Sequence, residues 1–459
     1  LRILAEQRGK TAKAGPEGKQ GGFKTGPPEL QPRGYCWEDP DAEDRYTIAT
    51  RAAPAGHRED LLERVADYGR FERILRRAAN NKEPGPDGIP NELLKSLPST
   101  AHKGVHQLMV VMWLKQDTPA AWKSSHTVML YKKGDPTNPA NYRPIGLALT
   151  VYKLWTALLT DVLSFHAREL GVINDCQHGF TPGRSTHLQL MTMLNALEDA
   201  KHNSQDIYCL YIDFTSAFDM VAHDKLLQLM WDQGFPWHAV RAVESLYTGA
   251  STLIRTRFGD SDPISIDRGT LQGDTLSPFL FLLFITPLLR WLHVGQRGYQ
   301  YGCLPAEEKA KHSCSAPAYA DDLAIVTNTL PNLRRQTEKV SRFLKWSGLE
   351  VNHSKCGVTG MLYRRSEGHP LAKTNIAWLR RQLQGQVWIG QNTVPFLHPH
   401  DEPYRYLGVL LTPSLNWSHQ RAALVDTVIE KADGILRSMA SDEQKLRLID
   451  TLLRPHIRY

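Results

Sequence analysis

The sequence predicts an α+β fold with more than one lobe, preceded by a flexible N-terminal tail. The chain has 459 residues, of which 41% are hydrophobic and 22% charged, so it can bury a substantial core. Several apolar runs flanked by turn formers are typical of strands, and other segments space their apolar residues as helices do. This composition excludes a fibrous or globally disordered protein.

Residues 1–58 are predicted to be a flexible, basic tail or linker. The first 33 residues hold six Gly and four Pro, with seven Lys or Arg against three Glu. Such a composition cannot bury enough surface to offset the entropy of the chain. Because the sequence starts at Leu1 without an initiator Met or the apolar core of a signal peptide, we expect a fragment, with no indication of export.

The first helical segment is expected from about Glu59 to Asn80-Asn81. Its apolar residues recur at helical spacing: Leu61, Leu62, Val65, Ile74 and Leu75. The Pro and Gly residues of the following segment, 82–88, predict a loop.

Acidic residues stand at the ends of predicted strands. The strands are three short hydrophobic runs: 207–212, 318–320 and 323–326. Asp213 closes the first run, and Asp321 and Asp322 lie between the other two. A tight strand-turn-strand would hold both acids of this pair at an exposed tip.

The longest apolar stretch, 276–289, is predicted to be a buried helix rather than a membrane span. It has fourteen residues including two prolines and ends at Arg290, whereas a span needs about 20 apolar residues. Ser277-Pro278 suits a helix start, and the residues 279–289 are apolar on every side. We therefore expect no membrane as a partner.

Cysteine content and charge restrict the compartment and the partners. The six cysteines include no CxxC pair, which is typical of a reducing compartment. The net charge of +7 and the pI near 9.0 permit a nucleic-acid partner without demonstrating one.

A helical lobe is predicted to begin near the C-terminus. One apolar stripe is made by Val425, Val428, Ile429, Ala432, Ile435, Leu436 and Met439. Residues 441–444, Ser-Asp-Glu-Gln, form a capping-box start for a second helix. Because the chain stops at Tyr459, we expect residues 413–459 to be the beginning of an unfinished lobe.

The three aspartates suggest a metal-dependent chemistry. Asp321 and Asp322 repel one another, and a third carboxylate at the same place, Asp213, would complete the oxygen-rich site that Mg²⁺ prefers. Two such ions about 4 Å apart could activate a 3′-hydroxyl and stabilise a leaving pyrophosphate. A single Asp at a strand end is more often a turn or cap residue, so only the combination points to catalysis.

Several motifs together resemble a reverse transcriptase of the LINE-type (non-long-terminal-repeat) retrotransposons. Residues 319–322, Tyr-Ala-Asp-Asp, are similar to the catalytic box of that family, 213–219 to its first metal-binding motif and 271–278 to the motif between them. Further blocks follow in the family's order: 85–92, 132–145, 177–185, 348–356 and 406–408. The resemblance covers roughly residues 60–412.

The resemblance implies a right-hand polymerase fold of fingers, palm and the start of a helical thumb. Under it, residues 59–205 are rich in fingers elements, 206–412 form the palm with inserted finger elements, and 413–459 start a truncated thumb. The implied activity is that of an RNA-directed DNA polymerase, which extends a primer 3′-hydroxyl with dNTPs on an RNA template, in target-primed reverse transcription.

The resemblance also implies the catalytic residues. Asp213, Asp321 and Asp322 would bind two Mg²⁺ ions, or Mn²⁺ as a substitute, together with the main-chain carbonyl of Phe214. Phosphoryl transfer needs positioning and charge neutralisation more than covalent help, so this triad would be nearly the whole catalyst. Lys355 matches a lysine proposed as the general acid for the leaving pyrophosphate.

The remaining residues implied by the resemblance would bind nucleotide and nucleic acid. Lys132, with Lys133 as an equal alternative, and Arg143 would bind the triphosphate of the dNTP. Phe218 would exclude a 2′-hydroxyl. Gln272 and Gly273 would let the nucleotide and the template strand approach closely, because glycine has no Cβ. Those for template and primer are Arg184, Tyr406, Leu407 and Gly408.

The implied partners are an RNA template, a DNA primer or target DNA, and dNTPs. An endonuclease is expected elsewhere in the intact element, and the location is expected to be intracellular, in the nucleus and in cytoplasmic ribonucleoprotein. The alternatives are a catalytically silent palm-fold protein that binds RNA, a degenerate fragment of an element and, more remotely, an RNA-dependent RNA polymerase. A viral RNA polymerase would accept a 2′-hydroxyl with polar groups where this chain has Phe218.

Overall fold

The structure is a computed structural model that describes residues 61–455 except 296, 302–311 and 365–368. The predicted tail at 1–58 lies outside the described residues. The described chain divides into two compact units whose segments alternate along the sequence. The first unit contains 61–174, 216–291 and 345–350, and the second contains 175–215, 292–344 and 351–455.

The first unit combines a mostly antiparallel sheet with helices. Its helices are α3 (Leu62–Val65), α4 (Tyr68–Arg77), α5 (Asn91–Ser96), α6 (Ser99–Lys115), α7 (Thr150–Glu169), α9 (His223–Asp232), α10 (Trp237–Tyr247) and most of α11 (Leu276–His293). Its strands are β1 (Ser124–Tyr131), β2 (Tyr142–Ala148), β5 (Ser251–Thr256), β6 (Gly259–Asp260) and β7 (Ile264–Ser265). The predicted first helical segment is confirmed as α3 and α4, which are interrupted at residues 66–67.

The sheet of this unit has the strand order β2-β1-β5-β6, and β7 also pairs with β5. The strands β1 and β2 form an antiparallel hairpin from Ser125↔Ala148 to Tyr131↔Tyr142, whereas β1 and β5 are parallel. Residues 132–141, which include a 3₁₀ turn at 139–141, connect the two strands.

Helix α11 confirms the predicted buried helix. It is long and apolar enough to cross a membrane by composition, but 83% of its apolar window is buried inside the protein. Large side chains along it, such as Phe281 and Phe284, are completely inaccessible. Burial on all sides explains why the helix carries no polar face, as expected for a core helix.

The second unit is built on an antiparallel sheet. Its helices are α8 (Thr186–His202), most of α12 (Leu330–Ser347), α13 (Lys373–Leu383), α14 (Ser418–Arg437) and α15 (Asp442–Leu448), which continues into a π-helical turn at Ile449–Leu453. Its strands are β3 (Ile207–Ile212), β4 (Phe214–Thr215), β8 (Tyr299–Tyr301), β9 (His312–Cys314), β10 (Ala318–Tyr319), β11 (Asp322–Thr327), the second residue of β12 (Glu350–Val351), β13 (Gly357–Met361), β14 (Trp388–Ile389), β15 (Asn392–Thr393), β16 (Tyr404–Tyr406) and β17 (Val409–Leu411).

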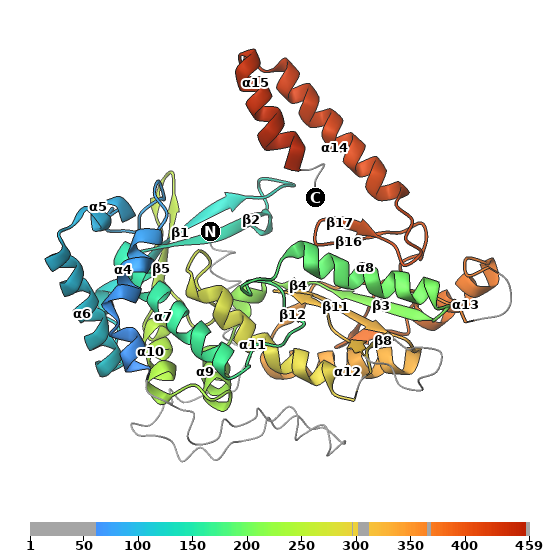
Figure 1. Cartoon of the computed structure of the whole chain (residues 1–459), viewed down its shortest axis with the longest axis horizontal. Helices are drawn as coiled ribbons and strands as arrows, with labels where there is room; N and C mark the ends of the chain where they lie inside the picture. The colour runs from blue at the N-terminus through green and yellow to red at the C-terminus, as the bar shows by residue number, and fades with distance from the viewer. Residues whose placement is uncertain (1–60, 296, 302–311, 365–368, 456–459) are drawn as a thin grey trace. The chain divides into compact units, whose positions relative to one another are not determined.

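The central sheet of the second unit has the order β10-β11-β3-β13. Every residue of β3 is buried, which explains its continuous hydrophobic sequence. On one face Cys209 and Tyr211 pack into a cluster with Met193 and Leu197 of α8, and Figure 1 shows α8 running along this sheet. The three predicted strands are therefore confirmed, and the core of the unit lies directly behind their acidic ends.

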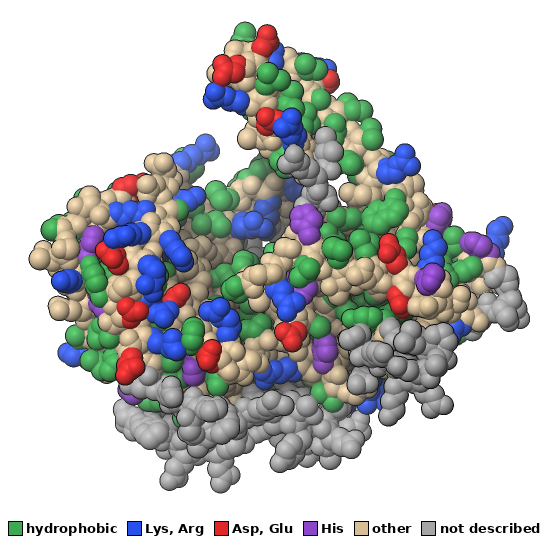
Figure 2. Space-filling model, viewed as in Figure 1, with side chains coloured by type: hydrophobic (Ala, Val, Ile, Leu, Met, Phe, Trp, Pro, Cys, Tyr) green, Lys and Arg blue, Asp and Glu red, His purple; other side chains and the backbone are tan. Residues whose placement is uncertain are grey.

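The predicted C-terminal helices form, but their apolar stripe is not buried. The capping box of Ser441 and Gln444 is present at α15. On α14 Ile435 is 5% exposed, whereas Val425, Ile429 and Leu436 are each more than half exposed. Figure 2 shows hydrophobic side chains at the surface of these helices. The spacing predicted the helix correctly, but burial also depends on a neighbouring element.

Candidate active site

The Tyr319–Asp322 segment, named here the catalytic turn, is a tight hairpin between β10 and β11. Tyr319 pairs with Asp322, so Ala320 and Asp321 form a two-residue turn. Ala320 has a φ of 55°, the left-handed conformation that a type II′ hairpin turn requires at its first position. Glycine adopts it freely, whereas alanine bears a cost of about 1–2 kcal/mol.

The sheet register places the third aspartate beside this turn. Strand β3 pairs antiparallel with β11, with Ile212 opposite Leu323, so Asp213 follows β3 next to the strand that begins at Asp322. One expectation needs correction, since only Asp321 lies in the turn itself. Asp322 is the first residue of β11 and is partly buried, because the hairpin has only two turn residues.

The three carboxylates interact electrostatically. The pKa of Asp322 is raised to about 6, first by burial and then by the negative charges of Asp321 and Asp213. The ammonium group of Lys355 acts in the opposite direction. Its Nζ lies 3.5 Å from Oδ2 of Asp213, and its side chain is 66% exposed. Lys355 therefore lies at the carboxylates and is accessible to a ligand.

The donor set suits a hard divalent cation. Carboxylate oxygens are preferred ligands of Mg²⁺, and a cation would offset both the burial and the repulsion by Asp321 and Asp213 that raise the pKa of Asp322. Within the described part of the chain, no three His, Cys, Asp or Glu side chains already converge closely enough to form a preorganised metal cluster. A bound ion would thus have to draw the carboxylates together.

The backbone of Asp213 is held on both sides by the segment that carries Lys355. The Asn352 N–H donates to the Asp213 carbonyl over 2.8 Å, and the Asp213 N–H points at the Cys356 Sγ over 3.5 Å. Phe214, predicted to contribute its carbonyl, follows directly in β4 and is buried. The sequence block at 348–356 was the only signal for Asn352 and Cys356, and it did not indicate this supporting role.

The predicted triphosphate residues lie on the β1–β2 hairpin of the first unit. Arg143 is opposite Leu130 in the register, and the Lys132 N–H donates to the Asn141 carbonyl over 2.8 Å at the end of the hairpin. Arg143, Lys132 and Lys133 are all exposed. The hairpin thus presents three positive side chains to solvent, where a phosphate could reach them.

Gln272 and Gly273 pack against the same hairpin. The Gly146 N–H of β2 donates to the Gln272 carbonyl over 2.6 Å. Gly273 has a φ of 105°, and a Cβ there would lie 3.0 Å from the Gly146 carbonyl oxygen. Both the conformation and the close approach require glycine. The Gln272 amide in turn donates to Asp219 over 3.2 Å.

Phe218 is placed on a 3₁₀ turn beside helix α11. Its ring stacks on Phe281 with centroids 4.7 Å apart, and its carbonyl accepts from the Thr270 N–H over 2.8 Å. The side chain is only partly buried. The ring is therefore supported from behind, with an accessible side remaining.

Asp274 is a buried carboxylate that sequence reasoning missed. It accepts from Thr275 N–H over 2.8 Å at the start of α11 and from the hydroxyl of Thr156. Burial raises its pKa to about 6, although these hydrogen bonds and the charge of Lys153 lower it. It follows Gln272-Gly273 directly, so it anchors that loop to helices α7 and α11. The motif at residues 271–278 contains Asp274, but the sequence did not indicate that this carboxylate is buried.

Arg184 stands just before helix α8, which is capped by Ser185. Its guanidinium lies 3.1 Å from Nε2 of His178 and 3.5 Å from Asp175. Burial lowers the pKa of His178, as does the positive charge of Arg184. A neutral His178 can accept the hydrogen bond and hold Arg184 in place.

Tyr406, Leu407 and Gly408 form the hairpin between β16 and β17. Leu407 and Gly408 both have positive φ, 48° and 90°, as a type I′ turn requires. Tyr406 is only 2% exposed, and its hydroxyl accepts from the Gln189 amide over 2.9 Å. Its side chain therefore anchors the hairpin to α8, while the turn is the part that can reach nucleic acid.

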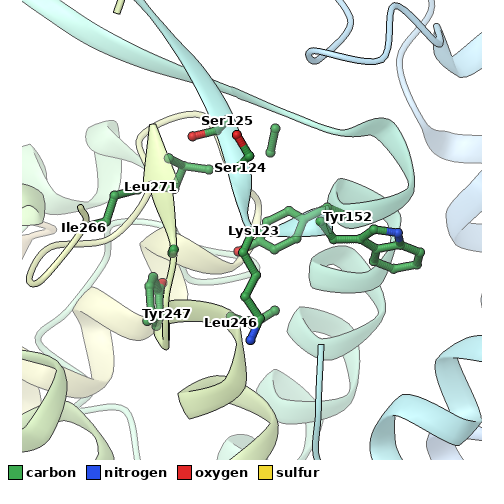
Figure 3. A pocket seen from close by; sticks show the side chains of 11 residues that line it. Lys123, Ser124, Ser125, Tyr152, Leu246, Tyr247, Ile266 and Leu271 are labelled. Atoms are coloured by element: carbon green, nitrogen blue, oxygen red, sulfur yellow. The ribbon is translucent and has the colours of Figure 1, made fainter. Parts of the chain in front are cut away.

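The hollow shown in Figure 3 is not a nucleotide site. It lies in the first unit among Lys123, Tyr152, Tyr247 and Leu271, and its volume is about 20 Å³. A single water needs about 10–15 Å³ of such space. The hollow is thus a packing gap behind the Gln272 loop.

The fold and this constellation define the class of protein. An antiparallel sheet that carries two adjacent aspartates on a hairpin and a third just after the neighbouring strand is the palm of a palm-type polymerase. The chain matches the family model described as reverse transcriptase (RNA-dependent DNA polymerase) over residues 131–411. The chain belongs to the reverse transcriptase family.

The similar proteins come from retrotransposons. The chain is 26% identical over 387 residues to the retrovirus-related Pol polyprotein from type-2 retrotransposable element R2DM of Drosophila melanogaster, covering 83% of this chain and 33% of that protein. It is 30% identical over 404 residues to the probable RNA-directed DNA polymerase from transposon X-element of the same species, covering 84% and 40%. It is 28% identical over 298 residues to the transposon TX1 uncharacterized 149 kDa protein of Xenopus laevis, covering 65% and 22%.

These relatives confirm the predicted LINE-type resemblance. The chain spans less than half the length of each of them.

Proposed function

We propose that this chain is an RNA-directed DNA polymerase that extends a primer 3′-hydroxyl with dNTPs on an RNA template, using two Mg²⁺ ions or Mn²⁺. The observation that supports this most is the placement of Asp213, Asp321 and Asp322 at the same end of the palm sheet, where burial first and then the charges of Asp321 and Asp213 raise the pKa of Asp322. Family membership supports the same reaction.

The three aspartates, Phe214 and Lys355 would act on the reacting atoms. When bound, divalent ions supply the charge that activates a hydroxyl nucleophile and stabilises a pyrophosphate leaving group. Asp213, Asp321 and Asp322 would hold these ions, with the Phe214 carbonyl as a further ligand. Lys355, exposed beside Asp213, would donate a proton from Nζ to the departing pyrophosphate oxygen.

A further group of residues would bind the incoming nucleotide. Arg143 and Lys132 would neutralise the triphosphate from the exposed hairpin. Phe218, supported by Phe281, would exclude a 2′-hydroxyl. Gln272 and Gly273 would allow the close approach of the nucleotide, since Gly273 presents no Cβ.

Arg184 and the 406–408 hairpin would contact the template and primer through phosphates and sugars. We further propose that the reaction is target-primed, with an endonuclease elsewhere in the intact element and a location in the nucleus and in cytoplasmic ribonucleoprotein. Retrotransposon relatives that are much longer than this chain support this setting.

Primer extension tests the proposal. The assay uses an RNA template with a DNA primer, Mg²⁺, and either dNTPs or rNTPs. We expect extension with dNTPs alone, and its loss by at least about a hundredfold in an Asp321→Asn, Asp322→Asn variant, because metal-assisted charge stabilisation is removed. Binding of the primer–template without extension would instead favour a catalytically silent RNA-binding protein.

A further inference from the structure

The segment Cys176–Gly179 lies against the catalytic turn as an additional edge of the palm sheet. The Ala318 N–H donates to the Cys176 carbonyl over 3.0 Å, and the His178 N–H donates to the Ala318 carbonyl over 2.9 Å. Gln177 and Ala318 thereby form a parallel bridge. This contact joins residues that are about 140 positions apart in the sequence.

The side-chain amide of Gln177 binds both main-chain groups of Ala320. Its Oε1 accepts from the Ala320 N–H over 2.7 Å, and its Nε2 donates to the Ala320 carbonyl over 3.1 Å. The same Oε1 also accepts from the Gly179 N–H over 2.8 Å. Gln177 is 1% exposed, so these hydrogen bonds are shielded from water.

Ala320 is the residue of the catalytic turn whose conformation needs support. Its φ of 55° is unfavourable for a residue with a Cβ. Such conformations persist when the surrounding structure determines them. The two hydrogen bonds from Gln177 stabilise this conformation of Ala320, because a different orientation of its peptide groups would break them.

Gly179 brings the supporting segment close enough to make these bonds. A Cβ at position 179 would lie 2.3 Å from the Ala320 nitrogen, which no real contact allows. The closeness of the two backbones therefore depends on glycine at this position.

We propose that Gln177 is a positioning residue that holds the catalytic turn in its left-handed conformation and so sets the metal affinity of Asp321 and Asp322. The inference rests on the proposed function, in which these aspartates bind the metal. Gln177 itself contacts neither metal nor substrate. Its effect passes through the Ala320 peptide, which immediately precedes Asp321.

The test compares the wild type with three variants. Gln177→Leu removes the hydrogen bonds at similar volume. The double variant Gln177→Leu, Ala320→Gly also lacks the hydrogen bonds, but its glycine at position 320 adopts positive φ without cost. Gln336→Leu is the matched control, because Gln336 is also fully buried in the second unit and donates to the Leu292 carbonyl over 2.7 Å, away from the turn.

The first measurement is a titration of the protein with Mn²⁺, in which the electron paramagnetic resonance signal of the free ion reports how much is bound. The second is the Mg²⁺ dependence of primer extension, with thermal unfolding and primer–template affinity measured on the same samples. The Asp321→Asn, Asp322→Asn variant defines the signal without the site. Gln177→Met replaces Gln177→Leu if that variant does not fold.

We expect Gln177→Leu to bind Mn²⁺ about five- to thirtyfold more weakly, the factor that corresponds to the cost of a left-handed non-glycine residue. Extension should then need correspondingly more Mg²⁺, with unchanged primer–template affinity. The added Ala320→Gly should recover most of the Mn²⁺ affinity, and Gln336→Leu should leave it unchanged.

Any of three results would overturn the inference: Mn²⁺ affinity of Gln177→Leu equal to that of the wild type, an equal loss in Gln336→Leu, or no recovery when Ala320→Gly is added. If the wild type binds Mn²⁺ but extends no primer, the proposed polymerase function fails while the Mn²⁺ comparison still decides the role of Gln177.

Discussion

Lys355 shows how one exposed side chain can act on a group of partly buried acids. Its Nζ lies 3.5 Å from Oδ2 of Asp213, and its positive charge partly offsets the rise in the pKa of Asp322 that burial and then the neighbouring carboxylates cause. At 66% exposure the pair itself adds little to stability, since solvent screens it. We therefore expect Lys355 to contribute to the rate of the reaction and not to the stability of the fold.

The Lys355→Met variant tests this role. We expect kcat for primer extension to fall about a hundred- to ten-thousandfold, the usual contribution of a general acid, with little change in thermal stability. Lys373→Met serves as the control, because Lys373 is an exposed lysine of the same unit at the start of α13. Equal rates for the two variants would contradict the assignment.

Asp274 makes the stability of the first unit depend on pH. Its pKa is raised from 3.8 to about 6 by burial, so the folded state binds its proton more tightly than the unfolded chain does. The resulting contribution to stability is fully present below about pH 4 and is lost as pH rises through about 6.

An Asp274→Asn variant should lack this pH dependence. Between pH 4.5 and 7.5 we expect the free energy of unfolding of the wild type to decrease by about 2 kcal/mol more than that of the variant. Urea unfolding at the two pH values measures the difference. Parallel changes in both proteins would show that Asp274 is not the group responsible.

At the scale of elements, two hairpins place functional residues by unusual backbone conformations. Ala320 adopts positive φ in the catalytic turn, and Leu407 with Gly408 does so in the β16–β17 turn. In both cases a two-residue loop has the handedness that matches twisted strands. Each turn is anchored by a glutamine side chain from outside its hairpin: Gln177 for the first and Gln189 for the second.

Helix α14 illustrates the difference between spacing and burial. Ile435 and Leu436 are neighbours in the predicted stripe, yet they are 5% and 69% exposed. Truncating Ile435→Ala should destabilise the protein by about 2 kcal/mol or more, whereas Leu436→Ala should change stability by less than about 0.5 kcal/mol. Thermal unfolding of the two variants distinguishes them, and similar losses would mean that the stripe is buried in solution.

At the scale of the whole molecule, charge and family membership point to nucleic acid. The net charge is +7, and the relatives are retrotransposon proteins. Protein groups that neutralise phosphates release counterions, so affinity falls linearly with salt on logarithmic axes. The magnitude depends on the number of phosphates contacted and not on the net charge alone.

We accordingly expect primer–template affinity to fall at least about tenfold when KCl rises from about 50 to about 200 mM, which corresponds to two or more phosphate contacts. Fluorescence anisotropy with a labelled primer–template measures this. In an Arg184→Gln variant, the slope of log affinity against log salt concentration should decrease by the amount that corresponds to about one phosphate contact. A wild-type affinity independent of salt would argue against phosphate recognition.

The sequence by itself determined the strands that carry Asp213, Asp321 and Asp322, the buried helix α11, the capping box at Ser441 and the family. These features depend on local periodicity, on turn chemistry and on motifs whose order is preserved, all of which can be read along one chain.

Only the tertiary structure decided the hydrogen bonds of Gln177 to Ala320, the burial of Asp274 and Tyr406, and the exposure of the α14 stripe. The physical reason is that each depends on partners distant in the sequence. Gln177 and Ala320 become neighbours only because β10 pairs with the segment around Gln177, far earlier in the sequence. Leu436 stays exposed because no described element packs on it. Spacing specifies which face of an element is apolar, while packing specifies what that face contacts.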